Sequence, residues 1–216
     1  MGLESEVMSF FEYWCGCSEV IAPKLVEALG IAIGSPIKDD CHFNYRSAHY
    51  YERPSSLVAP RCGEHRDFGY FTMIDCDSPG FEVYNSSEGL FQPVVVPEKG
   101  SLLLLFGWCS QIKSNGRISA CLHRVVDSVK AGIVPKRTSA VLFVAPKNET
   151  TPLVPVVKDG EIQKYKNVLV GDLRGELARK WQKREGTIKQ SDKFLEEKDI
   201  LLETIESCKS LPIKIK

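Results

Sequence analysis

The sequence predicts a mainly β fold with flanking helices, arranged as a single domain over residues 1–216. Short apolar segments separated by turn-forming clusters fill residues 42–146, as is typical of antiparallel β proteins. The segments 3–34 and 158–209 instead carry apolar side chains at helical spacing. A chain of 216 residues is long enough for one sizeable core and too short to favour two full domains.

The composition is that of an ordinary folded protein and points away from nucleic acids and membranes as partners. The 28 Lys and Arg residues balance the 28 Asp and Glu residues, so no basic excess favours a polyanion. The longest clear apolar run, residues 102–106, is far shorter than the ~20 residues that a membrane-spanning helix needs. The acidic N-terminus lacks the features of an export signal. We therefore interpret the eight cysteines as reduced thiols and expect a cytoplasmic protein.

The N-terminal segment predicts a helix that is split near its middle. Its apolar side chains recur three and four residues apart at Val7, Phe10, Phe11 and Trp14, and again at Val20, Leu25, Val26 and Leu29. Pro23 removes a backbone donor and crowds the preceding turn, so it should kink or divide the helix. Gly30 and Gly34 are candidate stops.

The central segment predicts short strands joined by tight turns. The strands expected from β-branched, aromatic and leucine content are 70–76, 81–84, 91–96, 101–106, 121–127 and 138–144. Gly, Pro, Asn and Asp cluster between them at residues 77–80, 86–89, 98–100 and 115–116. Many short strands at regular spacing indicate a sandwich or a barrel, and a double-sheet jelly roll is one such solution.

The C-terminal segment predicts two helices with a solvated outer face. Leu173, Leu177 and Trp181 form one narrow apolar stripe. A second stripe follows a candidate cap at Ser191 or Asp192 and consists of Phe194, Leu201, Ile205 and Cys208. We favour helices packed on the β core over a coil that binds a partner.

His65 and Asp67 are candidate metal ligands. Residues two apart on a strand point to the same face, so both side chains can aim at one point. Two histidines and one carboxylate on one face of a metal are diagnostic of oxygen-activating Fe(II) sites. Taken alone, the pair also fits a surface strand with mixed polar residues.

His123 is the favoured third ligand among the remaining histidines. It lies in a strand-like run, and several strands separate it from Asp67, as a ligand from the far side of a barrel requires. His42 and His49 lie in an aromatic-rich segment, where we expect hydrogen-bonded structural histidines.

Arg137 and Ser139 alternate on a further strand and would share a face. A guanidinium beside a hydroxyl suits one end of a dicarboxylate. The competing interpretation is a charged residue that opens an edge strand.

Four segments in order resemble the plant-type, isopenicillin N synthase-like 2-oxoglutarate dioxygenases. Residues 65–72 (HRDFGYFT) are similar to the family's H-x-D-x-G-x-x-T, and residues 79–83 (PGFEV) stand where the family has a G-L-Q-V segment. Residues 114–125 are similar to the family's S-N-G motif followed by L-H-R-V, and residues 137–139 (RTS) correspond to R-x-S. The resemblance covers roughly residues 15–150, the catalytic half of the family, and the joint pattern is specific.

The resemblance implies an eight-stranded jelly roll, also called a double-stranded β-helix and found in cupin-like proteins. It implies Fe(II) bound by His65, Asp67 and His123, with 2-oxoglutarate and dioxygen as co-substrates and ascorbate as an optional addition. Arg137 and Ser139 would hold the far carboxylate of 2-oxoglutarate. The implied reaction is oxidation of a small organic molecule, most often hydroxylation, with release of succinate and carbon dioxide.

Asn44 and Tyr45 resemble the family's N-x-Y strand, which helps to hold the co-substrate. Here Arg46 stands in place of the second tyrosine, so either Tyr45 compensates or that contact is lost. Strand alternation from Arg137 places Phe143 and Ala145 toward the substrate, which favours an apolar or aromatic small molecule.

Full-length members of the family carry an additional N-terminal region that this chain lacks. Three alternatives stay open: a 2-oxoglutarate-independent iron oxidase, a non-catalytic jelly-roll binding protein, which the shorter N-terminal region and Arg46 favour, and a zinc hydrolase of the cupin type. The last fits the ligands poorly, because no positioned base is evident.

Overall fold

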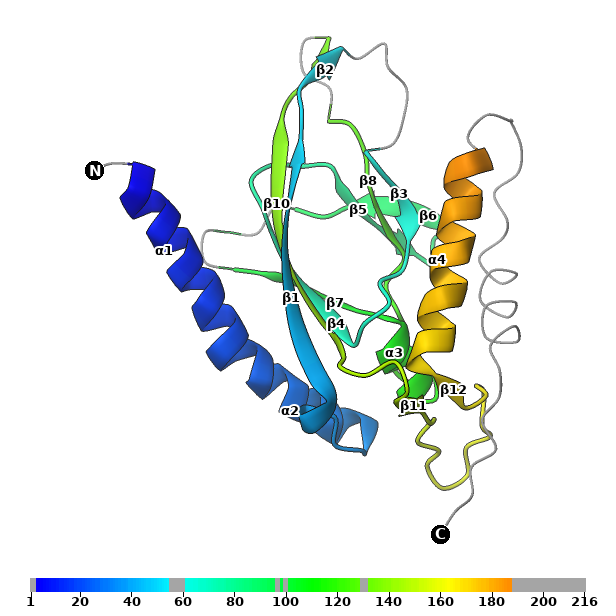
Figure 1. The fold of residues 1–216 in the computed structure, drawn as a ribbon. Coiled ribbons are helices and arrows are strands. Elements are labelled where there is room, and N and C mark those ends of the chain that lie inside the picture. The colour runs from blue at the N-terminus through cyan, green and yellow to red at the C-terminus, as the bar shows by residue number, and fades with distance from the viewer. Residues whose placement is uncertain (1–2, 55–60, 96–97, 99–100, 129–131, 188–216) are drawn as a thin grey trace.

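Two four-stranded antiparallel sheets face each other, with helices packed outside them (Figure 1). The computed structural model describes residues 3–54, 61–95, 98, 101–128 and 132–187. The pair of sheets, with an N-terminal helix and a C-terminal helix, is the predicted jelly roll.

The larger sheet has the strand order β1-β10-β4-β7. Its strands are Cys41–Tyr50, Arg137–Pro146, Phe71–Cys76 and Leu103–Phe106. β1 and β10 pair along their full length, from Cys41 opposite Pro146 to Tyr50 opposite Arg137. Because directly paired residues share a face, this register decides which side chains of β1 reach the space between the sheets.

The smaller sheet has the order β3-β8-β5-β6. Its strands are Cys62–His65, His123–Val125, Phe81–Asn85 and Leu90–Pro93. Two short pairs complete the β structure: β2 (Arg53–Pro54) with β9 (Ile133–Val134), and β11 (Pro152–Leu153) with β12 (Val168–Leu169). All six predicted strands are present, with ends that differ by a few residues, and β1 and β3 are additional to them.

The N-terminal helix is divided as predicted. α1 (Leu3–Gly16) runs into a π-helical turn, η1 (Cys17–Ile21), and α2 (Ala22–Ile33) follows with Pro23 in its first turn. The amide of Ala22 donates to the carbonyl of Cys17, five residues back, so the change to the wider turn lies directly before the proline. Gly34 ends α2 in the left-handed conformation at φ 89°. Gly30 is not a stop; it lies buried inside α2, where an added Cβ would crowd the chain at Ser35.

Two other helical elements differ from the prediction. α3 (Trp108–Lys113) was not predicted, because its six residues are too few to show a helical period. α4 begins at Val170, directly after β12, and the preceding residues 154–167, which were predicted to be helical from 158, form an irregular connection. A 3-10 turn, η2 (Lys38–Asp40), joins α2 to β1. α4 runs to Thr187, and the predicted second stripe, with its cap, lies outside the described residues.

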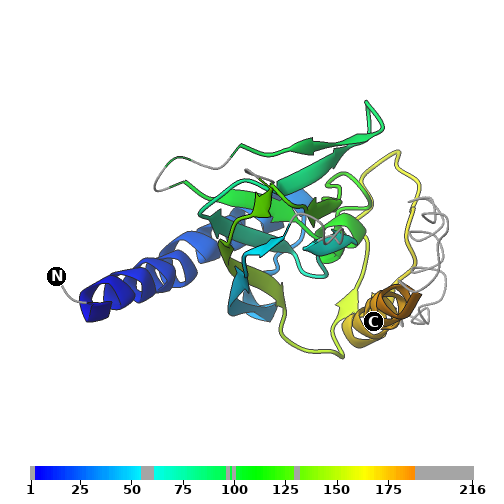
Figure 2. The same cartoon turned by 90° about the horizontal axis from the view of Figure 1, so that it is seen from above.

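The core has two layers, which lie on opposite faces of the larger sheet. One face packs against the helices and includes Trp14, Val26, Leu142 and Val144. The other face packs against the smaller sheet, where Ile74 and Leu105 meet Phe81 and Val125. Figure 2 shows the N-terminal helix and α4 on different sides of the sheets. The space between the sheets, which we call the inner face, therefore combines apolar packing with the candidate site.

No helix in the described part of the chain is long and apolar enough to cross a bilayer. This agrees with the absence of any long apolar run in the sequence.

Asp127 forms ion pairs with two arginines, Arg53 and Arg61, and these pairs give a prediction about stability. Its carboxylate accepts hydrogen bonds from Arg53 at 2.7 Å and Arg61 at 2.9 Å. Burial raises the pKa of Asp127, but these two guanidinium contacts outweigh it and leave the pKa below the ordinary value of 3.8. Asp127→Asn should lower the free energy of unfolding at pH 7 by about 1–3 kcal/mol.

The difference between the variant and the wild type should be present above pH 3.8 and vanish as the pH falls through the folded-state pKa, since Asp127 is then protonated in both states. Urea unfolding at several pH values measures it. Glu149→Gln is the control, because the exposed pair with Arg174 should contribute less than about 0.5 kcal/mol. Equal losses in both variants would contradict the prediction.

Candidate active site

His65 and His123 meet directly across the two strands β3 and β8. They are register partners, and their ring centroids lie 4.2 Å apart. The Nε2 atoms of His65 and His123 lie 3.6 and 3.9 Å from Oδ1 of Asp67. One ligand atom from each residue lies within 4.8 Å of the others, which is the spacing that a single metal ion needs.

Asp67 reaches this point from a loop, and not from the strand that the sequence predicted. β3 ends at His65, so strand alternation does not place Asp67. The loop is held by the start of α3. The backbone amides of Gly107, Trp108 and Cys109 donate to the carbonyls of Tyr70, Asp67 and Phe68 at 3.0, 2.9 and 3.1 Å.

Two glycines make that approach possible. A Cβ on Gly107 would overlap the carbonyl oxygens of Asp67 and Gly69, and a Cβ on Gly69 would overlap the carbonyl oxygen of Val144. The glycine two residues after Asp67 therefore has a local steric reason in this chain.

α3 also positions the segment that carries His123. The side-chain oxygen of Gln111 accepts from the amide of Ala120 at 2.6 Å, and Ser114 Oγ accepts from the amide of Ile118 at 3.0 Å. Asn115 and Gly116 turn the chain with φ of 55° and 81°. The predicted turn thus returns the chain from α3 to β8.

The donor set fits a divalent first-row metal. Nδ1 of His65 lies 2.8 Å from the carbonyl of Gly63, and Nδ1 of His123 lies 3.0 Å from that of Cys121. A carbonyl can only accept, so both Nδ1 atoms carry protons in these contacts and both Nε2 lone pairs are left for a metal. The second oxygen of Asp67 accepts from the hydroxyl of Thr72, which fixes the carboxylate. Two imidazoles and one carboxylate are the set expected for non-haem Fe(II).

Arg137 and Ser139 lie together on the inner face of β10, at 3% and 5% exposure. The Arg137 guanidinium donates to Ser139 Oγ and, through Nε, to the carbonyl of Ser78 at 3.1 Å. Its Nη2 is buried and has no hydrogen-bond partner. An unpaired buried guanidinium nitrogen is costly, and it fits a carboxylate acceptor supplied by a ligand.

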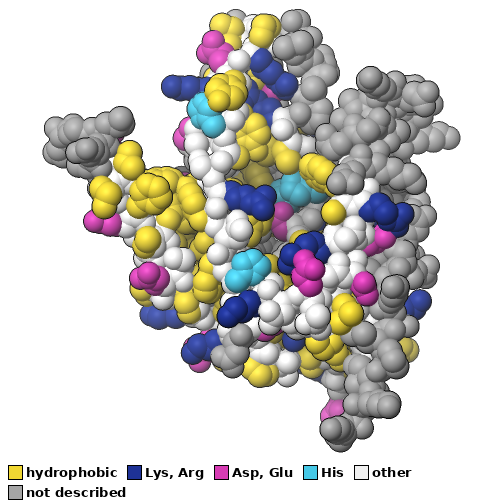
Figure 3. All heavy atoms as spheres, in the orientation of Figure 1, with side chains coloured by type: hydrophobic (Ala, Val, Ile, Leu, Met, Phe, Trp, Pro, Cys, Tyr) yellow, Lys and Arg dark blue, Asp and Glu magenta, His cyan; other side chains and the backbone are white. Residues whose placement is uncertain are grey.

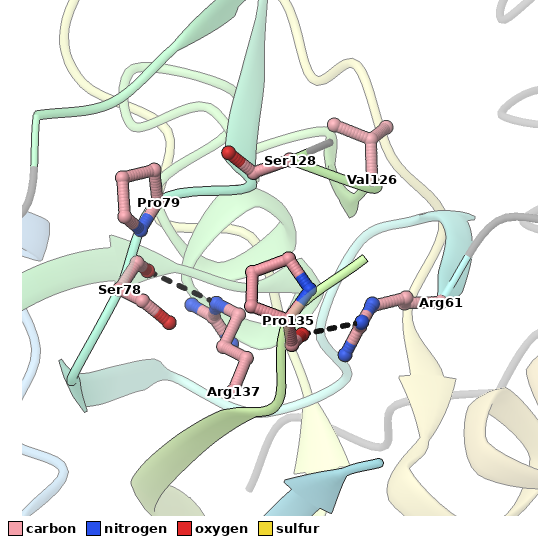
Figure 4. A pocket seen from close by; sticks show the side chains of 7 residues that line it. All are labelled: Arg61, Ser78, Pro79, Val126, Ser128, Pro135 and Arg137. Carbon is pink, nitrogen blue, oxygen red and sulfur yellow. Dashed lines mark hydrogen bonds between the residues drawn. The ribbon is translucent and has the colours of Figure 1, made fainter. Parts of the chain in front are cut away.

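Figure 4 shows a small cavity beside Arg137, also lined by Ser78, Pro79 and Arg61. Its volume of about 30 Å³ suits one solvent molecule and is too small for a dicarboxylate. A dicarboxylate on Arg137 would therefore approach from the space between the sheets.

The structure separates the two residues predicted on β1. Asn44 is exposed on the inner face, and it accepts from Nε of Arg46 at 3.2 Å. The Tyr45 ring lies on the opposite face, tilted against Trp14 at 5.3 Å between centroids. Asn44 and Tyr45 are therefore not brought together, and Tyr45 packs in the helical layer.

Tyr50 is the aromatic residue of β1 that lies beside Arg137, and sequence reasoning missed it. The two residues are register partners, and the guanidinium carbon lies 5.6 Å from the ring centroid. Burial raises the pKa of the Tyr50 phenol, so it stays a neutral donor at physiological pH. Strand alternation could have identified Tyr50 from the sequence, because Tyr50 and Asn44 are an even number of residues apart on β1 and so point to the same face.

Phe143 and Ala145 border the metal ligands from β10. Phe143 is paired with Thr72, the residue that holds Asp67. Ala145 is buried, and an added Cβ at Gly69 would lie 3.3 Å from the Ala145 Cβ. Both side chains thus lie next to the loop that carries Asp67.

α4 supplies one residue to the site. The Trp181 ring packs edge-on against His65, with centroids 5.2 Å apart and an angle of 80°. Trp181 was predicted only as part of a packing stripe. Leu173 and Leu177 of that stripe do pack on the core. Figure 3 shows a hollow on this side of the molecule with histidine, acidic and cationic side chains around it.

Residues 40–146 match the family model described as 2OG-Fe(II) oxygenase superfamily. The chain is 32% identical over 158 residues to a 2-oxoglutarate-dependent dioxygenase DAO of Oryza sativa subsp. indica, an alignment that covers 71% of this chain and 50% of the relative. It is 31% identical over 186 residues to a bi-functional coumaroyl CoA and feruloyl CoA ortho-hydroxylase of Ipomoea batatas, which covers 82% and 51%.

Solved structures give the same picture of the fold. The dioxygenase for auxin oxidation of rice superposes with a TM-score of 0.60 at 27% identity, covering 74% of this chain and 54% of the other. A full-length Neurospora crassa protein in complex with alpha-KG superposes with a TM-score of 0.64 at 24% identity, covering 82% and 58%. The chain spans about half the length of the curated relatives it matches.

The hydroxyl of Thr72 should contribute to metal affinity through Asp67. Thr72→Val keeps the shape of the side chain and removes the donor, so the affinity for Mn(II) or Co(II) should fall about 10- to 100-fold. Thr72→Ser keeps the hydroxyl and should retain most of the affinity. Calorimetric titration measures both, and wild-type affinity in Thr72→Val would contradict the role of this hydrogen bond.

The contact between Trp181 and His65 predicts a fluorescence signal. Co(II) bound by His65 would lie close to the Trp181 indole and quench its emission, whereas Trp14 and Trp108 lie in other packing layers. Trp181→Phe should abolish most of the quenching while leaving the affinity measured by calorimetry nearly unchanged. Full quenching in Trp181→Phe would show that another tryptophan reports on the metal.

Proposed function

Because the chain belongs to the 2OG-Fe(II) oxygenase superfamily, we propose that it is a dioxygenase that oxidises a small organic molecule with 2-oxoglutarate and dioxygen. The observation that carries the proposal is the convergence of His65, Asp67 and His123 on the inner face that also holds the unpaired guanidinium nitrogen of Arg137. Hydroxylation is the expected outcome.

Each group of the site would have a separate task. His65, Asp67 and His123 would hold Fe(II) from one side, which leaves the other side open to ligands. Arg137 and Ser139 would bind the far carboxylate of 2-oxoglutarate, and Tyr50, the register partner of Arg137, would add a hydroxyl donor beside it. Asn44 lies on the same face, farther along β1.

Fe(II) and 2-oxoglutarate, when bound, supply the oxidation of a C–H bond by dioxygen with release of succinate and carbon dioxide. The chain contributes binding, orientation and exclusion of water. The buried carboxylate of Asp67 is kept in one orientation by Thr72, and backbone carbonyls accept from Nδ1–H of the two imidazoles and so fix their ring orientation. Apolar packing between the sheets, from Ile74, Leu105 and Phe81, limits access of water to this region.

We also propose that residues 1–216 act as one domain and that the protein works in the cytoplasm on a small molecule. The described cysteines are all free thiols, which supports a reducing compartment. The balanced charge supports a small-molecule substrate over nucleic acid.

An anaerobic titration with Fe(II) and then 2-oxoglutarate tests the proposal through the visible metal-to-ligand charge-transfer band. The wild type should develop the band, and His123→Ala should not. Arg137→Met should weaken 2-oxoglutarate binding by about 2–5 kcal/mol, because a buried charge-assisted contact is lost. Tyr50→Phe should weaken it by about 1 kcal/mol, the value of one hydrogen bond.

Tyr45→Phe is the matched control, because its ring packs in the helical layer and should leave 2-oxoglutarate affinity unchanged. Iron binding without a band would favour a 2-oxoglutarate-independent oxidase or a non-catalytic relative. Formation of one succinate per substrate oxidised separates the dioxygenase from the former.

A further inference from the structure

We infer that the substrate is a small organic carboxylate with an apolar body, and that its carboxylate pairs with Arg46. The inference rests on the proposed function, since it concerns the substrate of the same site. Arg46 stands where the family that this chain resembles commonly has a tyrosine. An arginine at this position is therefore a feature of this chain.

Arg46 is connected to the candidate metal site through Phe143 and Thr72 on the two neighbouring strands. Its guanidinium carbon lies 5.5 Å from the ring centroid of Phe143, on the inner face of β1 and β10. Phe143 pairs in turn with Thr72 of β4, whose hydroxyl donates to Asp67. Arg46 and Phe143 thus form the border of the site on the side of the larger sheet.

Arg46 lacks the carboxylate partner that most arginines of this fold have. Six others pair with an acidic side chain, namely Arg53, Arg61, Arg117, Arg124, Arg174 and Arg179. No described carboxylate pairs with Arg46, and its hydrogen bond to Asn44 is with a neutral amide. Arg137, which we assign to a ligand carboxylate, shares this property. The positive charge of Arg46 is therefore left for an anion from outside the described chain.

The two arginines serve different anions because they lie at different depths. Arg46 is opposite Val141, four positions along β10 from Arg137, which separates their backbone attachment points by roughly 13 Å. Arg137 is buried, whereas Arg46 is exposed. A ligand held at Arg137 fills the deep end of the inner face. Arg46 instead presents its guanidinium at the exposed edge of the larger sheet, since β1 is an edge strand, and an anion can reach it there.

The surroundings of Arg46 select the body of the substrate. The guanidinium lies over the Phe143 ring, and stacking of this kind leaves the N–H edge free to meet a carboxylate. Phe143 is half-buried, and Trp181 approaches the metal ligands from α4. Aromatic side chains on two sides favour a flat apolar body attached to the carboxylate.

The test compares aromatic acids with their primary amides, for example naphthalene-2-acetate and naphthalene-2-acetamide. Each pair is titrated by calorimetry into the full chain loaded anaerobically with Fe(II) and 2-oxoglutarate. The wild type should bind at least one acid more tightly than its amide. Arg46→Met should weaken acid binding about 10- to 100-fold and leave amide binding unchanged. Arg46→Lys, which keeps the charge, should fall between the two. Lys24→Met, which removes an exposed charge on α2, is the control and should match the wild type.

The charge-transfer band separates this inference from the proposed function. Arg46→Met should form the band with wild-type affinity for 2-oxoglutarate, which also shows that the variant is folded. If 2-oxoglutarate binding weakens instead, Arg46 belongs to the co-substrate and the inference is wrong. It is equally wrong if no acid binds the wild type better than its amide. If the wild type forms no band but Arg46→Met still removes the preference for acids, the anion site stands and the oxygenase proposal fails.

Discussion

The contact between the start of α3 and the loop after β3 is the constraint on which the site depends. The first amides of a helix have no partner within the helix, and buried carbonyls in a loop have none within the loop. Here each set satisfies the other, since the amides of residues 107–109 bind the carbonyls of residues 67–70. The close approach requires Gly69 and Gly107. The same short helix then fixes the chain that leads to His123, through Gln111 and Ser114. The short helix α3 therefore sets the positions of two candidate ligands, Asp67 and His123, that are far apart in sequence.

The two faces of the larger sheet have different roles, one in packing and the other in the candidate site. On β10, Leu142 and Val144 pack against the helices, whereas Ser139 and Phe143 face the smaller sheet. A shift of β1 by one residue would exchange these roles, placing Tyr45 in the site and Tyr50 in the core. The full-length pairing of β1 with β10 prevents such a shift. Chemistry and packing can thus share one sheet because the pleat keeps them on opposite sides.

Much of this arrangement was accessible from the sequence, and the failures have physical causes. The division of the N-terminal helix followed from Pro23, and the turn at Asn115 and Gly116 followed from its residue types. The three candidate ligands were found from residue chemistry and motif order. Tyr45 was grouped with Asn44 as a co-substrate residue because the two are adjacent in the motif. Adjacent residues on a strand point to opposite faces of the sheet, and Tyr45 lies on the face away from the site. Asp67 was placed on a strand that ends two residues earlier, since strand ends depend on partners elsewhere in the chain. The role of Trp181 could not be predicted, because it depends on where a distant helix docks.

The position of His65 has a consequence for the way a metal would leave the protein. β3 is the edge strand of the smaller sheet, and His65 is its last residue. The ring that packs edge-on against His65 comes from α4, whose Leu173 and Leu177 pack on the core. Edge strands and peripheral helices open at lower free energy than central strands. His123, by contrast, lies on an inner strand of the same sheet. The three candidate ligands are therefore unequal in the ease with which they would release a metal. We therefore expect His65 to release a bound ion first, and the docking equilibrium of α4, which holds none of the candidate ligands, to set the rate of that release.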